Sequence, residues 1–299
     1  MENARPVAAI FCKSFRPDFE RLERLVDSVE RFVEPDICLL LSVPAEDRRA
    51  ADAQFGRNGR VQIVCDEDYV RNGTTKGWVG QQICKMNVFR TGFADLYFAI
   101  DSDSYFIRPF GYADFHDEGG CPKVIASPVF TGYEDWNTRL KALLDGAEPP
   151  PLPIIRPEGS RPRLDLSGLR TANLATLSAG EREPLLELVF GRQTRGLAFQ
   201  PCQFLAAAVL RSLEEDLLAQ DVSLHDALHM VPWEYNWYGS YCLHSRPIAL
   251  ALVTSPTIMF ATLNAVENAR QRDLTHAVLA RHFAAVQMAA RHHDTLSLE

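Results

Sequence analysis

Hydrophobic positions in the first third of the chain form two patterns, short continuous runs and positions repeated every three to four residues. Four short apolar, β-prone runs predict buried strands at 7–15, 37–43, 61–65 and 96–100. A helix after the first strand is predicted by apolar residues at helical spacing: Phe19, Leu22, Leu25, Val26, Val29 and Phe32. Further helical patterns lie at 46–55 and 79–91. Strands that alternate with helices at this spacing predict an α/β fold with a parallel sheet.

The second half of the chain is less regular. Six prolines fall between residues 146 and 168, which predicts a loop or lid over 141–170. Helices are expected at 181–190 and 203–218, a late strand at 247–253, and a helix over the last thirty residues. We expect 1–140 and 171–299 to be parts of one continuous domain, joined by this loop.

Composition narrows the classes of function. The 299 residues are 46% hydrophobic and 23% charged, which is the balance of an ordinary globular protein. A net charge of −8 argues against a broad nucleic-acid surface. The seven cysteines are scattered without a CxxC pair, which favours reduced thiols in the cytoplasm and argues against a zinc site. The longest apolar region, 248–263, is interrupted by Thr, Ser and Pro, so no transmembrane segment is expected.

The central chemical feature is the acidic pair Asp101 and Asp103, which directly follows the fourth predicted strand. The carboxyl ends of strands form the ligand crevice of open α/β sheets. Two carboxylates at positions i and i+2 can reach one hard cation such as Mg²⁺ or Mn²⁺. A DxD tripeptide by itself is common and is often only a solvated turn, so its placement after a buried strand carries the inference.

With this motif the chain resembles the GT-A-type glycosyltransferases, in particular a poorly characterised bacterial group. The resemblance extends over residues 10–15, 80–86, 101–103 and 233–239, and is best within 5–110. It implies a Rossmann-type mixed sheet flanked by helices, with a donor-binding region at 1–140 and an acceptor-side region at 171–299. It also implies that Asp101 and Asp103 hold Mn²⁺ or Mg²⁺ and the diphosphate of a nucleotide-sugar donor, most often a UDP-sugar.

Several polar residues are candidates for donor binding. Lys13 and Ser14 end the first strand beside the crevice, although a solvent-exposed strand end is an equal alternative. Gln82 and Lys85 share one face of the helix at 79–91 with apolar neighbours, so we expect them to point into a site. The alternative for Lys85 is a side chain that lays its stem over the core. Ser102, within the acidic motif, completes the donor set.

The aromatic segment at 232–238 is the candidate acceptor site. Trp233, Tyr235 and Tyr238 offer faces on which sugar rings stack, and Glu234 among them is the candidate general base of an inverting displacement. A core aromatic cluster with an incidental Glu is the alternative. The resemblance makes His244 a candidate third metal ligand, although such a His is more often a packed residue.

Two other functions compete with sugar transfer. Asp101 after an apolar strand resembles the nucleophile of the haloacid-dehalogenase phosphatases, but three strands precede it and no second acidic pair is evident. A non-catalytic saccharide-binding relative is the other alternative. For the transferase we expect a saccharide or lipid-linked acceptor, as in bacterial surface polysaccharide synthesis. A cationic face on the C-terminal helix would allow peripheral contact with the inner face of the membrane, although a solvated helix face is the more common reason for such charges.

Overall fold

The computed structural model describes residues 6–71, 75–128, 154–155, 164–191, 197–199, 201–260 and 263–288. Most of the predicted loop or lid at 141–170 lies outside these residues. The described helices are α1 Phe19–Phe32, α2 Arg48–Phe55, α3 Asp66–Tyr69, α4 Gly77–Asn87, α5 Tyr112–Phe115, α7 Ser167–Thr171, α8 Ala179–Arg182, α9 Leu186–Phe190, α10 Ala207–Leu218, α11 Leu224–Met230, α12 Glu234–Ser245, α13 Leu263–Gln271 and α14 His276–Leu279.

A five-stranded sheet forms the centre of the fold, with the order β10-β4-β1-β2-β3. Its strands are β1 Ala8–Lys13, β2 Leu39–Val43, β3 Val61–Cys65, β4 Leu96–Ala99 and β10 Gln203–Ala206. The first four are parallel and β10 runs antiparallel beside β4. The four predicted strands and the mixed, mainly parallel sheet are confirmed.

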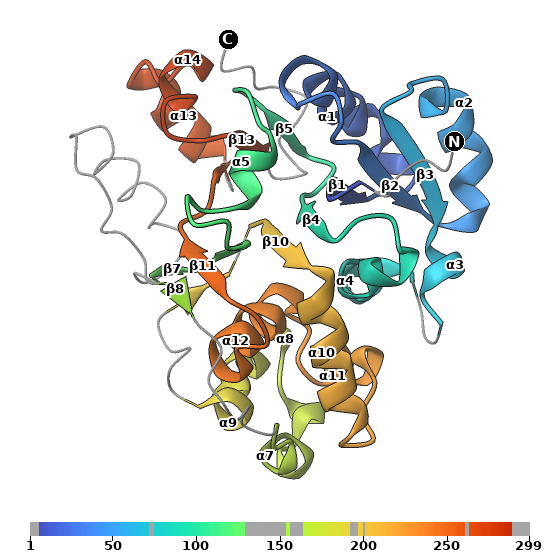
Figure 1. The fold of residues 1–299 in the computed structure, drawn as a ribbon, viewed down its shortest axis with the longest axis vertical. Helices are drawn as coiled ribbons and strands as arrows, with labels where there is room; N and C mark the ends of the chain where they lie inside the picture. Colours follow the sequence, from blue (N-terminus) through green and yellow to red (C-terminus); the bar gives the residue numbers. More distant parts are fainter. Residues whose placement is uncertain are drawn as a thin grey trace.

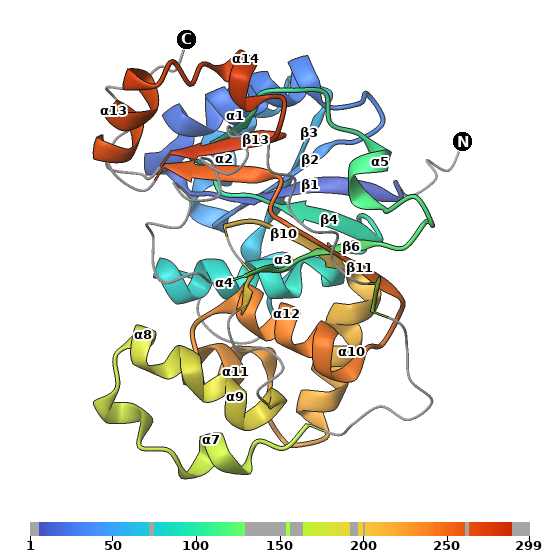
Figure 2. The same cartoon turned by 90° about the vertical axis from the view of Figure 1, so that its left-hand side faces the viewer.

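Helices cover both faces of this sheet, with α1 and α2 on one side and α4, α10 and α12 on the other (Figures 1 and 2). Helix α1 forms because apolar residues recur every three to four positions, and Leu22, Leu25 and Val29 are almost fully buried. Strands β1, β2, β3 and β4 end at the same edge of the sheet, since they are parallel. Asp101 and Asp103 follow β4 there, as predicted.

Three smaller sheets lie beside the central one, with the orders β6-β11-β8, β12-β13-β5 and β7-β9. Their strands are β5 Ser104–Phe106, β6 Lys123–Ile125, β7 Ser127–Pro128, β8 Ile154–Ile155, β9 Leu197–Ala198, β11 Leu250–Val253, β12 Thr257–Phe260 and β13 Ala285–Met288. The predicted late strand is therefore confirmed as β11. Strand β13 pairs with β5, which immediately follows the acidic motif.

Three predictions for the second half were wrong in part. The helix expected at 203–218 is a strand, β10, followed by α10, and the helix expected at 181–190 is broken by a 3-10 turn at Glu183–Leu185. The C-terminal region is not one helix, because α13 and α14 are followed by strand β13. Tertiary pairing with β5 and β12 decides this last case over the local helical spacing.

No helix in the described part of the chain has both the length and the apolarity needed to cross a bilayer.

Candidate functional site

The two aspartates converge on a single amide group. The backbone turns at Asp101, whose carbonyl accepts a hydrogen bond from the amide of Ser104. The Nε2 atom of Gln287 then donates to Oδ2 of Asp101 and to Oδ1 of Asp103, at 3.1 Å in both cases. One nitrogen atom thus lies between the two carboxylates. Their placement meets the requirement for sharing a cation, because their oxygens face a common point.

Gln287 reaches this position through the pairing of β13 with β5. The register sets Gln287 opposite Ser104, and the amide of Met288 donates to the carbonyl of Asp103 at 2.9 Å. The side chain of Gln287 is buried, at 7% exposure.

The ammonium group of Lys85 joins the acidic motif to helix α12. Its Nζ lies 2.7 Å from Oδ1 of Asp101 and 3.0 Å from Oε1 of Glu234. The ring of Tyr235 lies under the same atom, at 4.9 Å from Nζ to the ring centroid. Lys85 comes from α4, as predicted, and it is buried because α4 packs between the sheet and α12. The ion pairs explain how such a residue tolerates burial.

The pKa values of the site reflect this crowding. Burial, and then the nearby carboxylate of Asp101, raise the pKa of Asp103 to about 7. Burial would lower the pKa of Lys85, but Asp101 and Glu234 outweigh it and raise the Lys85 pKa well above its ordinary value. The ammonium form of Lys85 is thereby favoured, and the raised pKa of Asp103 indicates that further positive charge beside the two carboxylates would stabilise their ionised forms. A divalent cation at this point would supply that charge.

A small cavity opens beside these charges. Its volume is about 140 Å³, and it is lined by Trp78, Gln81, Gln82, Lys85, Asp101, Pro201, Trp233, Glu234 and Tyr235. Ligand pockets commonly measure about 300–1,000 Å³, so this cavity suits one part of a substrate such as a sugar ring. Gln82 is 2% exposed, and neither atom of its carboxamide has a hydrogen-bond partner within the described structure. Buried amides are normally satisfied, so this one is ready for a ligand group.

Two tryptophans stand at the same cavity. The rings of Trp78 and Trp233 meet edge to face with centroids 5.3 Å apart, and Trp78 is 49% exposed. The indole nitrogen of Trp233 donates to the carbonyl of Ala179 at 3.0 Å, which fixes its ring. Because the ring of Trp78 is partly exposed, the pair forms an aromatic surface that is open to solvent. Sugar rings stack on surfaces of this kind.

Lys13 and Ser14 lie at the end of β1, at the edge of the sheet where β4 also ends, as predicted. Nζ of Lys13 forms a buried ion pair with Asp66 at 2.9 Å and donates to the carbonyl of Ser14 at 2.6 Å. Both residues are buried, so the exposed-strand-end alternative is wrong, and neither lines the cavity beside Asp101. Ser102 is nearly buried and its hydroxyl donates to Asp18 at 3.4 Å. The turn that brings Asp101 and Asp103 together directs Ser102 elsewhere.

Two predictions on helix α12 need correction: Tyr238 as an acceptor-binding residue and His244 as a metal ligand. Tyr238 is fully buried, and its hydroxyl accepts a hydrogen bond from the amide of Ala206 at 2.8 Å, so it belongs to the core beneath β10. His244 contacts the carbonyl and the ring of Phe190 near the last turn of α12. Because a helix rises about 1.5 Å per residue, His244 lies about 15 Å along α12 from Glu234 and the charged cluster. It is therefore not the third ligand of a cation at Asp101.

Gln287 is the site residue that sequence reasoning missed. No group of three or more His, Cys, Asp and Glu side chains suited to a metal was found in the described part of the chain. The residues present still fit a hard divalent cation, since two carboxylates and an amide supply oxygen ligands and water and phosphate complete the shell. The only local signal was the short apolar run at 283–288, which does not indicate its partner strand.

Comparisons with known proteins add the following. Residues 5–144 match the model of a family of unknown function, DUF6492. No curated protein matches the chain. Similar solved structures include TarS of S. aureus (10% identity, TM-score 0.39) and WbbM, a bifunctional glycosyltransferase in its apo form (9%, 0.44). Mouse xyloside xylosyltransferase 1 in its apo form is another (10%, 0.41).

The coverage of these structures differs. The alignment covers 83%, 96% and 95% of this chain, but 35% of TarS, 46% of WbbM and 99% of the xylosyltransferase. The chain thus spans about a third and just under half of the first two. All three TM-scores lie below 0.5, and all three identities are 10% or less.

Proposed function

We propose that this protein is a metal-dependent glycosyltransferase that moves a sugar from a nucleoside-diphosphate sugar to a saccharide or lipid-linked acceptor. The observation that carries the proposal is the convergence of Asp101 and Asp103 on one point beside a cavity that also holds Lys85 and Glu234. Such a cluster combines a cation site, a fixed positive charge and a carboxylate base within one small volume.

The cation would be held by Asp101, Asp103 and the amide of Gln287. The nitrogen of that amide faces both carboxylates. A half-turn of the carboxamide would present its oxygen to the same point, which costs little because its two ends have nearly the same shape. When bound, a divalent cation neutralises the diphosphate and makes it a better leaving group.

The remaining side chains have separate tasks. Lys85 adds a positive charge beside Asp101, where the donor diphosphate would gain negative charge. It also holds Oε1 of Glu234, which leaves Oε2 for the proton of the acceptor hydroxyl. The free carboxamide of Gln82 would bind a sugar hydroxyl within the cavity. Trp78 and Trp233 would stack against a sugar ring at its mouth.

The phosphatase alternative has less support. Asp101 follows the fourth strand of the central sheet, and its Oδ1 is held by Lys85. In-line attack on phosphate requires a carboxylate oxygen free to approach phosphorus. Trapping of a covalent aspartyl-phosphate would reverse this judgement.

A thermal-shift screen tests the proposal. UDP, GDP and other nucleoside diphosphates are added with Mn²⁺ or with EDTA to the wild-type protein, to Asp103→Asn, and to Asp36→Asn as an exposed control. Binding to the native state raises the melting temperature. We expect one diphosphate to raise it only with Mn²⁺, in wild type and Asp36→Asn but not in Asp103→Asn. An equal rise in all three proteins, or none with any nucleotide, would contradict the proposal.

A further inference from the structure

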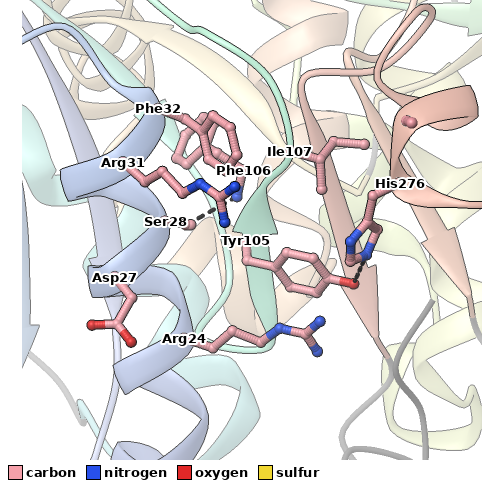
Figure 3. A pocket seen from close by; sticks show the side chains of 10 residues that line it. Arg24, Asp27, Ser28, Arg31, Phe32, Tyr105, Phe106, Ile107 and His276 are labelled. Carbon is pink, nitrogen blue, oxygen red and sulfur yellow. Dashed lines mark hydrogen bonds between the residues drawn. The ribbon is translucent and has the colours of Figure 1, made fainter. Parts of the chain in front are cut away.

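A second cavity lies between helix α1, strand β5 and the start of α14. Its volume is about 470 Å³, and it is lined by Arg24, Asp27, Ser28, Arg31, Phe32, Tyr105, Phe106, Ile107, His276 and Ala277. Figure 3 shows the guanidinium groups of Arg24 and Arg31 reaching from α1 toward Tyr105, with His276 on the opposite wall. The volume is within the range typical of small-molecule sites.

The two arginines are positioned by aromatic rings and not by carboxylates. The Cζ atom of Arg24 lies 3.6 Å from the centroid of the Tyr105 ring, and that of Arg31 lies 4.9 Å from the Phe32 ring. Tyr105 is itself fixed by a hydrogen bond of 3.0 Å between its hydroxyl and Nε2 of His276. A guanidinium stacked on a ring is held in place while its N–H edges stay available.

No ion pair or hydrogen bond joins either guanidinium to an acid within the described residues. Asp27 lines the same cavity, and its carboxylate lies on the side of α1 away from Tyr105 (Figure 3). The protein carries a net charge of −8, so acidic partners are plentiful in the chain. Two arginines facing one cavity without such a partner favour an anionic ligand.

This cavity is separate from the site at Asp101. Successive side chains of a strand point to opposite faces of the sheet. Ser104 and Gln287 are paired on one face, while Tyr105 and Val286 are paired on the other and pack in a separate apolar cluster. The cavity also takes Phe106 from the face of Ser104, but it shares no lining residue with the cavity beside Asp101.

We propose that this cavity binds a phosphate monoester or diester, with Arg24 and Arg31 donating to the phosphate oxygens. A phosphate presents several oxygens and can accept from two guanidinium groups at once. The same group occurs in soluble phosphate esters and in phospholipid headgroups, and both sources can be tested. The proposal does not depend on the metal site.

The test compares binding of two probes in EDTA, which removes any contribution of a cation at Asp101. Glycerol 3-phosphate is titrated by calorimetry, and co-sedimentation is measured with vesicles of phosphatidylglycerol and phosphatidylcholine against phosphatidylcholine alone. The proteins are wild type, Arg24→Gln/Arg31→Gln, and Arg49→Gln, which removes an exposed arginine on α2. Arg31→Gln alone is included because Arg24 also packs on Tyr105, so the double variant removes a contact that supports the fold.

We expect wild type and Arg49→Gln to bind at least one probe equally, with at least a tenfold weaker affinity in the double variant and a smaller loss in Arg31→Gln. Binding of glycerol 3-phosphate would identify a soluble ester as the source, and binding only to the anionic vesicles would identify a lipid headgroup. Absence of binding to both probes, or equal binding by Arg31→Gln and wild type, would overturn the proposal.

Discussion

Replacing Lys85 by Met should destabilise the protein strongly. The side chain is 6% exposed, and its Nζ lies within 3.0 Å of both Asp101 and Glu234. Met keeps much of the volume of the stem but removes the charge. Glu234, whose side chain is only 7% exposed, would then be left as a buried carboxylate without its cation.

The size of the effect follows from that burial. Removing one partner of a buried ion pair costs about 3–5 kcal/mol, because the other charge stays desolvated. Asp101 adds little to this figure, since its side chain is 34% exposed and water can solvate it. We therefore expect the free energy of unfolding to fall by about 3–5 kcal/mol. That is a loss of about two to three and a half powers of ten in the ratio of folded to unfolded protein.

Urea denaturation followed by circular dichroism measures this loss. The matched control is Lys76→Met, because Lys76 also forms an ion pair, with Glu46 at 3.1 Å, but both side chains are about two-thirds exposed. That change should cost less than about 1 kcal/mol. The double variant Lys85→Met/Glu234→Leu should lose less than the sum of the single changes. If Lys85→Met and Lys76→Met lowered the free energy of unfolding by equal, small amounts, the ion pairs of Lys85 would not be stabilising as we expect.

Three further predictions concern the framework around the site. Lys13→Met should lower the free energy of unfolding, measured by urea denaturation, by about 3–5 kcal/mol, since it leaves the carboxylate of Asp66 buried without its cation. The double variant Lys13→Met/Asp66→Leu should recover part of that loss. Losses that simply add in the double variant would argue against the ion pair. Arg60→Met should lower the free energy of unfolding by about 3 kcal/mol. The guanidinium of Arg60 donates to the carbonyls of Val29, Val33, Glu34 and Ile37, in the last turn of α1 and the segment after it. A loss below about 1 kcal/mol would show that water satisfies these carbonyls when the guanidinium is removed. Ser223→Ala should cost about 1 kcal/mol at pH 7, since Ser223 caps α11. Hydrogen bonds from Ser223 lower the pKa of Asp226 in the folded state, so their stabilisation is present above the unfolded value of about 3.9 and disappears as the pH falls through the lower folded pKa. A difference between wild type and Ser223→Ala that stayed constant from pH 7 to pH 2 would contradict this reasoning.

The central sheet could be predicted from sequence largely because β1, β2 and β4 are buried on both faces. Ala8 to Cys12 and Leu39 to Leu41 are completely buried, so each strand appears as a continuous apolar run bounded by polar turns. The acidic motif follows one such run, and its position at the strand end fixes where it lies in the fold. Gln82 and Lys85 could be assigned to one helix face for the same reason: their spacing of three defines the face before any contact is known.

The second half could not be predicted as well, because its elements depend on distant partners. Helix α12 is buried on nearly all sides, so no apolar stripe indicates which of its residues reach the site. The aromatic segment suggests Tyr238 and the family resemblance suggests His244, whereas the direction of each side chain is set by packing against β10 and α9. Gln287 lies 184 positions from Asp103, and only the pairing of β13 with β5 brings the two together.

The dependence of sugar transfer on a divalent cation and on Asp101 and Asp103 can be measured in one assay. Release of nucleoside diphosphate from the nucleotide sugar whose diphosphate binds best is measured with Mn²⁺ and with EDTA, in wild type, Asp101→Ala/Asp103→Ala and the exposed control Asp36→Ala. We expect turnover that requires Mn²⁺, is lost in the double variant and is retained in the control. Full turnover by Asp101→Ala/Asp103→Ala, or equal turnover in EDTA, would contradict it.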